Sequence, residues 1–451
     1  MQQKSSHEID MLHGPVLPAY FAFTIPMALS MLLQLLFNAA DVIVVGRFAG
    51  ANALAAVGST TSLVALMINI ISGLSTGVNT IIARDYARDC FDTVSNAVHT
   101  SLPFGFLGGL AVALLAIPAA HPILTLMQSP PEVIGMSVIY LRIYFISLPM
   151  IALYNFGAAI LRSIGDTRRP MLYLLFSGIV NLLLNLYMVI VLRLGVIGVG
   201  VATAVSNTIS ALLVLGALLR EDSCLRFRPS QMAFLPNTLR EILHFGLPAS
   251  IQGSLFAFSN ILIQSSVNSF GSVYMAGNAA AQSVEGFQYA FLMANMSATL
   301  TFMSQHIGAG LYERSRIVLR TIITAGMVIT TLIGIVFAFF RVPLLTLYNP
   351  DPAVLGVAMR RMTILVLIAA LEIPMDSYSN AIRAAGRTIE PTVISLIGAC
   401  GFRVLWLMTV FRIFHYYETI FMVWPVSWVL TGLADIVFYK RIMKSHFKPA
   451  Q

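Results

Sequence analysis

The first long apolar stretch of the chain contains three regularly spaced polar residues. Gln34, Asn38 and Asp41 are spaced at i, i+4 and i+7, so a helix would place them on one face. An ionisable residue in a membrane helix is costly, and it normally faces a helix bundle or a watery cavity. A carboxylate there can bind a proton or, with other oxygen ligands, a sodium ion. We therefore predict an ion or proton site at Asp41.

Polar residues in later apolar stretches are candidates to complete this site. Asn181 and Asn185 are one helical turn apart and face the same way, and Thr203 lies in the following stretch. Their oxygen atoms can ligate Na⁺ or adjust the proton affinity of a carboxylate. The alternative is that the amides only bond neighbouring helices, as intramembrane Asn often does.

The second half of the chain carries its acids elsewhere. Glu285 stands alone, whereas Glu372 and Asp376 are i, i+4 neighbours on one face, and Ile263 occupies the position that matches Asp41. We therefore expect the two halves to have different functions, ion coupling in the first and attraction of cations in the second. The alternative is that Glu372 and Asp376 are solvated at a helix end or bonded to an arginine. Further candidates for lining a cavity are Gln34, Gln252, Asn260 and Gln282.

Pro26 lies in the same stretch as Asp41, and it has a counterpart in Pro248. A proline removes one backbone hydrogen bond of a membrane helix and permits a bend. The bend is either a static kink or a hinge that responds to protonation of Asp41. The absence of an acid at the matching position of the second half tempers the hinge interpretation.

The composition predicts an all-α polytopic membrane protein. The 451 residues are 58% hydrophobic and 10% charged, with a mean hydropathy of +0.83, whereas a soluble protein carries about 25% charged residues. We predict about twelve transmembrane helices of roughly 20 residues or more, enough to cross the bilayer. Their approximate limits are 16–45, 53–83, 94–118, 134–160, 170–192, 195–219, 242–268, 277–306, 317–340, 354–382, 391–411 and 419–439.

The basic residues are unevenly distributed between the two ends of these helices. Of the 27 Lys and Arg residues, we assign 19 to one side of the membrane, 6 to the other, and only Arg142 and Arg403 to the interior of the spans. Because cytoplasmic loops are enriched in Lys and Arg, we place both termini and the linker 220–240 in the cytoplasm. The net charge of +8 therefore reflects membrane topology and does not indicate nucleic-acid binding. We expect a plasma-membrane protein.

The two halves of the chain repeat. The segment ending at Pro170 matches the segment ending at Pro391, and the same offset of 221 residues relates Pro122-Ile-Leu-Thr-Leu to Pro343-Leu-Leu-Thr-Leu. Six spans in each half make the copies parallel repeats, related by an axis along the membrane normal. We predict two six-helix bundles, an N-terminal lobe (1–221) and a C-terminal lobe (222–451), with a substrate path between them.

Several of these stretches resemble the MATE (multidrug and toxic compound extrusion) family. They include TIPMALSMLLQLLFNAADVIVVG, the turn RSIGDTRRP, and FMSQHIGAGLYERSR. The resemblance covers nearly the whole chain and is closer to the DinF-like branch. It implies that Asp41 couples transport to ions together with Asn38, Asn181, Asn185 and Thr203, and it makes Pro26 the hinge.

The resemblance implies a secondary active antiporter that exports amphipathic, often cationic, drugs in exchange for H⁺ or Na⁺ by alternating access. Where the family often has a fifth-helix aspartate, this chain has Asn185, which favours H⁺ over a strong Na⁺ site. The tenth-helix acid of the NorM-like branch falls on Glu372, and Phe256 stands where that branch has a seventh-helix glutamate that helps bind the cation. We expect a monomer without cofactors and without a metal other than Na⁺.

Three other functions compete with drug export. A lipid-linked oligosaccharide flippase of the same superfamily would need a basic cavity, and few Lys or Arg residues fall within the spans. An enzyme is disfavoured because the sequence has no HExxH motif, clustered histidines or nucleophile elbow. A channel is disfavoured because two repeated halves are typical of a carrier.

Overall fold

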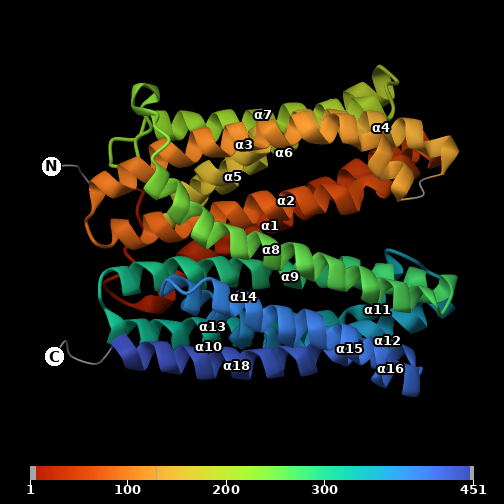
Figure 1. Cartoon of the computed structure of the whole chain (residues 1–451). Coiled ribbons are helices and arrows are strands. Elements are labelled where there is room, and N and C mark those ends of the chain that lie inside the picture. The colour runs from red at the N-terminus through yellow and green to blue at the C-terminus, as the bar shows by residue number, and fades with distance from the viewer. Residues whose placement is uncertain (1–6, 128–129, 447–451) are drawn as a thin grey trace. The chain divides into compact units, whose positions relative to one another are not determined.

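The computed structural model describes residues 7–127 and 130–446, which form helices joined by short turns (Figure 1). The chain ends, whose cytoplasmic location we predict, lie partly outside the described residues. The helices are α1 (Val16–Val44), α2 (Ala51–Tyr86), α3 (Phe91–Leu126), α4 (Pro131–Ile146), α5 (Leu148–Ser163), α6 (Arg168–Leu186), α7 (Val196–Leu219), α8 (Pro236–Asn268), α9 (Ser272–Gly308), α10 (Tyr312–Phe339), α11 (Arg341–Thr346), α12 (Pro352–Ile368), α13 (Glu372–Ala384), α14 (Ile389–Ser395), α15 (Phe402–Met408), α16 (Val410–Ile413), α17 (Tyr417–Phe421) and α18 (Val423–His446).

These helices supply ten or eleven candidate membrane segments in the described chain. Ten helical segments are long and apolar enough to cross a membrane, and α4 with α5, bent by 44°, makes an eleventh. Pro149 in the first turn of α5 cannot continue the hydrogen bonds of α4, which accounts for the break. The remaining long helix is α9, which has 37 residues and a more polar sequence. Counted with α9, the described chain has twelve long helical segments, of which ten or eleven are long and apolar enough to cross a membrane.

The chain forms two compact units. Unit 1 contains Leu29–Ser250, and unit 2 contains Asp10–Ala28 together with the chain from Ile251 onward. The change of unit therefore falls inside α1 and again inside α8, in each case two residues after a proline, Pro26 or Pro248. The predicted lobe boundary near residue 221 remains a prediction.

The internal repeat is visible in the backbone of the turns. Three pairs of residues with positive φ are each separated by 221 residues. The pairs are Gly50 and Gly271, Asp89 and Gly310, and Gly165 and Gly386. A left-handed conformation is costly for most side chains, and five of these six residues are glycine. The copies therefore share the turns that end their helices, and they differ in the side chains buried between helices.

Close backbone contacts hold the first part of α8 against α2 within unit 1. A Cβ atom at Gly77 would lie 2.5 Å from the Ile242 carbonyl oxygen and 2.8 Å from the Gly246 nitrogen. In addition, the Ser250 hydroxyl donates a hydrogen bond of 2.9 Å to the Ile70 carbonyl. Small residues allow such close approach between membrane helices, where packing is a main source of stability.

We expect Gly77→Ala to destabilise the protein, because the added methyl group meets backbone atoms that cannot rotate away. The loss should be about 1–3 kcal/mol, as for other overpacked interiors. Gly108→Ala is the matched control, since a Cβ atom at Gly108 in α3 meets nothing within 4 Å. Thermal unfolding of the purified proteins in detergent measures both. Equal midpoints for the two variants would contradict the close contact.

Candidate functional site

Asp41 lies in the last part of α1, within unit 1, and it contacts the two asparagines of α6. The Asn185 amide nitrogen donates a short hydrogen bond to Oδ1 of Asp41, and the same nitrogen lies 3.2 Å from Oδ1 of Asn181. Asn185 is fully buried and Asn181 is 4% exposed. Tyr140 of α4 is close enough to Asp41 to interact with its charge. The contact between α1 and α6 thus brings together Asp41, Asn181 and Asn185, three of the residues predicted to share one site.

Two properties of this cluster matter for chemistry. Asp41 has no Lys or Arg partner among the described residues, so a neutral amide is the group that contacts its carboxylate. Oδ1 of Asn185 is buried and has no hydrogen-bond partner among the described residues. A carboxylate and a free amide oxygen in a protein interior provide oxygen atoms that can bind a proton or a cation.

The other first-lobe candidates occupy different positions. The Thr203 hydroxyl in α7 donates to the Val199 carbonyl of its own helix, at 2.9 Å. Asn38 and Gln34 are exposed on α1, and neither forms a side-chain hydrogen bond with the described residues. Pro26 is buried in the part of α1 that belongs to unit 2, and α1 continues as a helix through it.

In unit 2, Glu285 of α9 forms a two-pronged ion pair with Arg361 of α12. The Arg361 Nη2 atom lies 2.6 Å from Oε2 of Glu285, and Nε lies 3.0 Å from Oε1. The remaining nitrogen, Nη1, donates to Oδ1 of Asn278 at 2.6 Å. The guanidinium lies over the rings of Phe421 and Trp424, at 4.9 and 5.6 Å from their centroids. This arrangement satisfies a buried charge with hydrogen bonds and aromatic faces.

The acids of α13 are part of a second charged cluster in unit 2. Asp376 is 8% exposed and interacts electrostatically with Glu372, Arg383 and Arg403. Arg383 also donates a short hydrogen bond to Oε1 of Gln252 in α8. Arg383 and Arg403 thus contribute to the electrostatic environment of these acids, and a cation site at Glu372 and Asp376 remains a prediction. Asn260 and Gln282, also proposed as cavity-lining residues, are exposed.

One acid of this cluster was not predicted from the sequence. Asp435 of α18 is fully buried, and neither of its carboxylate oxygens has a hydrogen-bond partner among the described residues. It interacts electrostatically with Arg383 and Asp376 of α13, the helix that packs against α18. Asp435 is a single acid in the last long helix, and this isolation was the signal that could have identified it.

The prediction that only Arg142 and Arg403 lie within the spans was wrong. Arg361 and Arg383 both lie in the candidate span Pro352–Ala384, where Arg361 is 4% exposed and Arg383 is 6% exposed. Counting charges by their distance from a predicted helix end assigned both to loops. In the structure, carboxylates and amides of neighbouring helices allow the two arginines to be buried.

Long apolar helices with polar residues buried between them are typical of a polytopic membrane protein. The family model described as MatE matches residues 26–187 and residues 248–408, which are the two copies of the repeat. The chain is also 30% identical over 433 residues to the "Probable multidrug resistance protein YoeA" of Bacillus subtilis (strain 168), covering 94% of this chain and 93% of that protein. The chain belongs to the MATE family.

Other relatives and solved structures agree with this assignment. The "Multidrug export protein MepA" of Staphylococcus aureus (strain NCTC 8325 / PS 47) is 21% identical over 88% of both chains, and the "FAD transporter" of Shewanella oneidensis is 24% identical over 76% of this chain and 77% of its own. The structure described as the outward-facing conformation of a multidrug resistance MATE family transporter superposes with a TM-score of 0.91 at 20% identity, covering 99% of this chain and all of that one. The fold is therefore shared along the whole chain.

Proposed function

We propose that the chain is a secondary active antiporter that exports amphipathic or cationic compounds and imports H⁺ in exchange. The environment of Asp41 supports H⁺ as the coupling ion. Its carboxylate contacts an amide and has no basic partner among the described residues. In an apolar interior, a carboxylate without a counter-charge is stabilised by binding a proton. The names of the multidrug resistance and export relatives support the substrate class.

The amide of Asn185 provides a way to sense this proton. Its nitrogen donates to Oδ1 of Asp41 in the structure, as it would to an ionised carboxylate, and its oxygen could instead accept from a protonated carboxyl group. Protonation of Asp41 would therefore reverse the hydrogen bond between α1 and α6. We propose that this reversal changes the packing of α1, with Pro26 as the point of bending, and that it links proton binding to alternating access within a monomer.

Vesicles containing the purified protein test this proposal. Efflux of an ethidium-type dye is followed under an imposed pH gradient alone and under a Na⁺ gradient alone. Transport driven by the pH gradient and lost in Asp41→Asn supports proton antiport. Transport driven only by Na⁺ would overturn the H⁺ assignment, and it would direct attention to Asn185 as a ligand or to Glu285, Glu372 and Asp376.

Asn185→Asp should increase the dependence of transport on Na⁺. The variant places a second carboxylate against Asp41, and two adjacent carboxylates favour a shared cation, because like charges otherwise repel. We expect Na⁺ to stimulate dye efflux in this variant more than in the native protein at the same pH. Asn181→Asp, one turn away on α6, is the matched comparison. No Na⁺ response in either variant would contradict a site built around the Asp41 oxygen atoms.

A lipid-linked oligosaccharide flippase is the second candidate function. The buried arginines revealed by the structure would supply the basic groups that this function needs. However, Arg361 is paired with Glu285, and Arg383 interacts with Asp376 and Gln252, so these cations are already neutralised or occupied. The dye assay separates the two functions, because a flippase would move no dye under either gradient.

A further inference from the structure

A polar cavity of about 460 Å³ lies in unit 1, where the linker that follows α7 crosses the start of α3. Four residues at i, i+3, i+4 and i+7 form its α3 wall. These residues are Asp92, Ser95, Asn96 and His99. The opposite wall comes from the linker and includes Arg226 and Arg228. The volume falls in the range of small-molecule sites, and the lining is polar instead of apolar.

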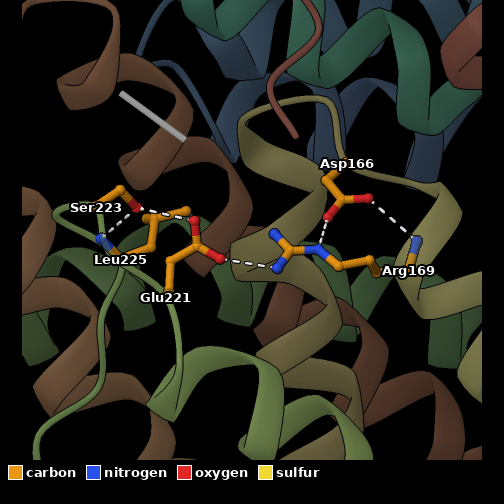
Figure 2. A network of polar contacts seen from close by, with 5 residues as sticks. All are labelled: Asp166, Arg169, Glu221, Ser223 and Leu225. Atoms are coloured by element: carbon orange, nitrogen blue, oxygen red, sulfur yellow. Dashed lines mark hydrogen bonds and ion pairs between the residues drawn. The ribbon is translucent and has the colours of Figure 1, made fainter. Parts of the chain in front are cut away.

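The start of the linker is fixed by a network centred on Arg169 of α6 (Figure 2). The Nη1 atom of Arg169 donates to Oε2 of Glu221 at 2.8 Å, and Nε forms a short contact with Asp166 of the preceding turn. Ser223 donates through its hydroxyl to Oε1 of Glu221, and the Leu225 amide donates to that hydroxyl, both at 3.3 Å. One wall of the cavity is therefore held in position by ion pairs.

The far side of the linker is fixed by His99, which is 4% exposed. Its Nδ1 atom lies 2.7 Å from the Ser95 carbonyl oxygen, so Nδ1 carries the proton and donates. Its Nε2 atom accepts from the Arg228 backbone amide at 2.9 Å, and its ring stacks on Phe227 with centroids 5.5 Å apart. The Thr100 hydroxyl donates to the Ala233 carbonyl at 3.0 Å. These contacts preform the cavity without a ligand.

The charged groups around the cavity favour an anion. The side chains of Arg226 and Arg228 form no hydrogen bond or ion pair with the described residues. Asp92 is the acidic residue that lines the cavity, and it lies in the first turn of α3, where the helix field stabilises a negative charge. Two guanidinium groups, together with the amide of Asn96, present donors suited to phosphate oxygens.

We propose that this cavity binds a phosphate ester, carried either by a phospholipid headgroup or by a soluble nucleotide. The two arginines would bind the phosphate, and Asp92 would accept a hydrogen bond from an alcohol or ammonium group of the same ligand. Bound there, the ligand would join the linker to α3. This site is separate from Asp41 and independent of the coupling ion.

Binding assays on the full-length protein test the proposal and identify the source of the phosphate. Titration calorimetry in detergent measures the binding of inorganic phosphate and of AMP. Native mass spectrometry counts the lipids that the protein retains from nanodiscs, which contain either phosphatidylglycerol or a glycosyl diacylglycerol without phosphate. We expect retention of phosphatidylglycerol alone if the ligand is a lipid, and binding of AMP if it is soluble. Arg226→Gln/Arg228→Gln should weaken whichever binding occurs at least about tenfold.

The control is Arg220→Gln, which removes an exposed arginine from the same linker but outside the cavity lining. It should bind like the native protein, and equal unfolding midpoints would show that both variants are folded. The proposal is overturned if no probe binds the native protein, or if the double variant binds as well as Arg220→Gln. Neither outcome bears on the proton coupling, since no transport is measured.

Discussion

Asp41→Asn is expected to reduce dye efflux driven by a pH gradient to the rate of protein-free vesicles, while the protein remains folded and inserted. Asparagine has nearly the shape of aspartate, and its oxygen can still accept the hydrogen bond from the Asn185 amide. The variant therefore keeps the contact between α1 and α6 but loses the group that binds and releases a proton. The measurement is the initial rate of efflux in reconstituted vesicles at a fixed pH difference.

The neighbouring polar residue provides the control for this experiment. Asn38 lies one turn before Asp41 on α1, but it is exposed and forms no side-chain hydrogen bond with the described residues. Asn38→Ala should therefore retain most of the efflux, although its spacing made it a candidate member of the same site. Efflux that survives in Asp41→Asn would exclude this carboxylate as the coupling group. Equal losses in both variants would instead indicate general damage to α1.

The second half of the chain has no carboxylate at the position that matches Asp41, so we expect a single coupling carboxylate of this kind in the protein. Ile263 follows Asp41 by 222 residues, is 3% exposed and packs in an apolar cluster with Val267 and Phe421. The repeat has kept the helix and lost the charge. Four acids of unit 2 lie between its helices and interact with basic side chains, namely Glu285 of α9, Glu372 and Asp376 of α13, and Asp435 of α18. Their electrostatic environment differs from that of Asp41, whose direct partner is an amide.

Helical periodicity and the repeat were sufficient to predict much of the fold. The predicted span 277–306 corresponds to α9. The three residues Asp41, Asn181 and Asn185 were also grouped correctly, because each lies on one helical face and the family resemblance related those faces. A single sequence contains this information, since it depends on spacing within a helix and on similarity between halves.

Contacts between helices could not be predicted in the same way. Periodicity shows which residues share a face, but it does not show which face of another helix they meet. Glu285 was therefore considered as an isolated acid and Arg361 as a loop charge, although they form one ion pair across α9 and α12. Asp435 was visible in the sequence as a single acid within a predicted span, but its interactions with charges of α13 could not be predicted from α18 alone. Such pairs follow from helix packing, which depends on the whole set of apolar contacts.

Glu285→Gln is expected to destabilise the folded protein by about 3–5 kcal/mol, the usual cost of removing one member of a buried ion pair. Arg361 would remain 4% exposed with a full charge, and its partners would be the neutral Asn278 and the rings of Phe421 and Trp424. Arg361→Met should have a comparable effect, because it leaves the charge of Glu285 without its partner. The midpoint of thermal unfolding in detergent measures both losses.

The double variant Glu285→Gln/Arg361→Met separates the ion pair from simple loss of packing. With both charges removed, no unpaired charge remains in the interior, so the double variant should be more stable than either single variant. The neighbouring pair Arg360–Glu418 is the matched control, because its side chains are 60% and 41% exposed and its nitrogen and oxygen are 3.4 Å apart. Arg360→Met should change stability by less than about 1 kcal/mol. If the two single variants behaved like this control, or if their losses simply added in the double variant, the ion pair would not be the interaction that holds α9 against α12.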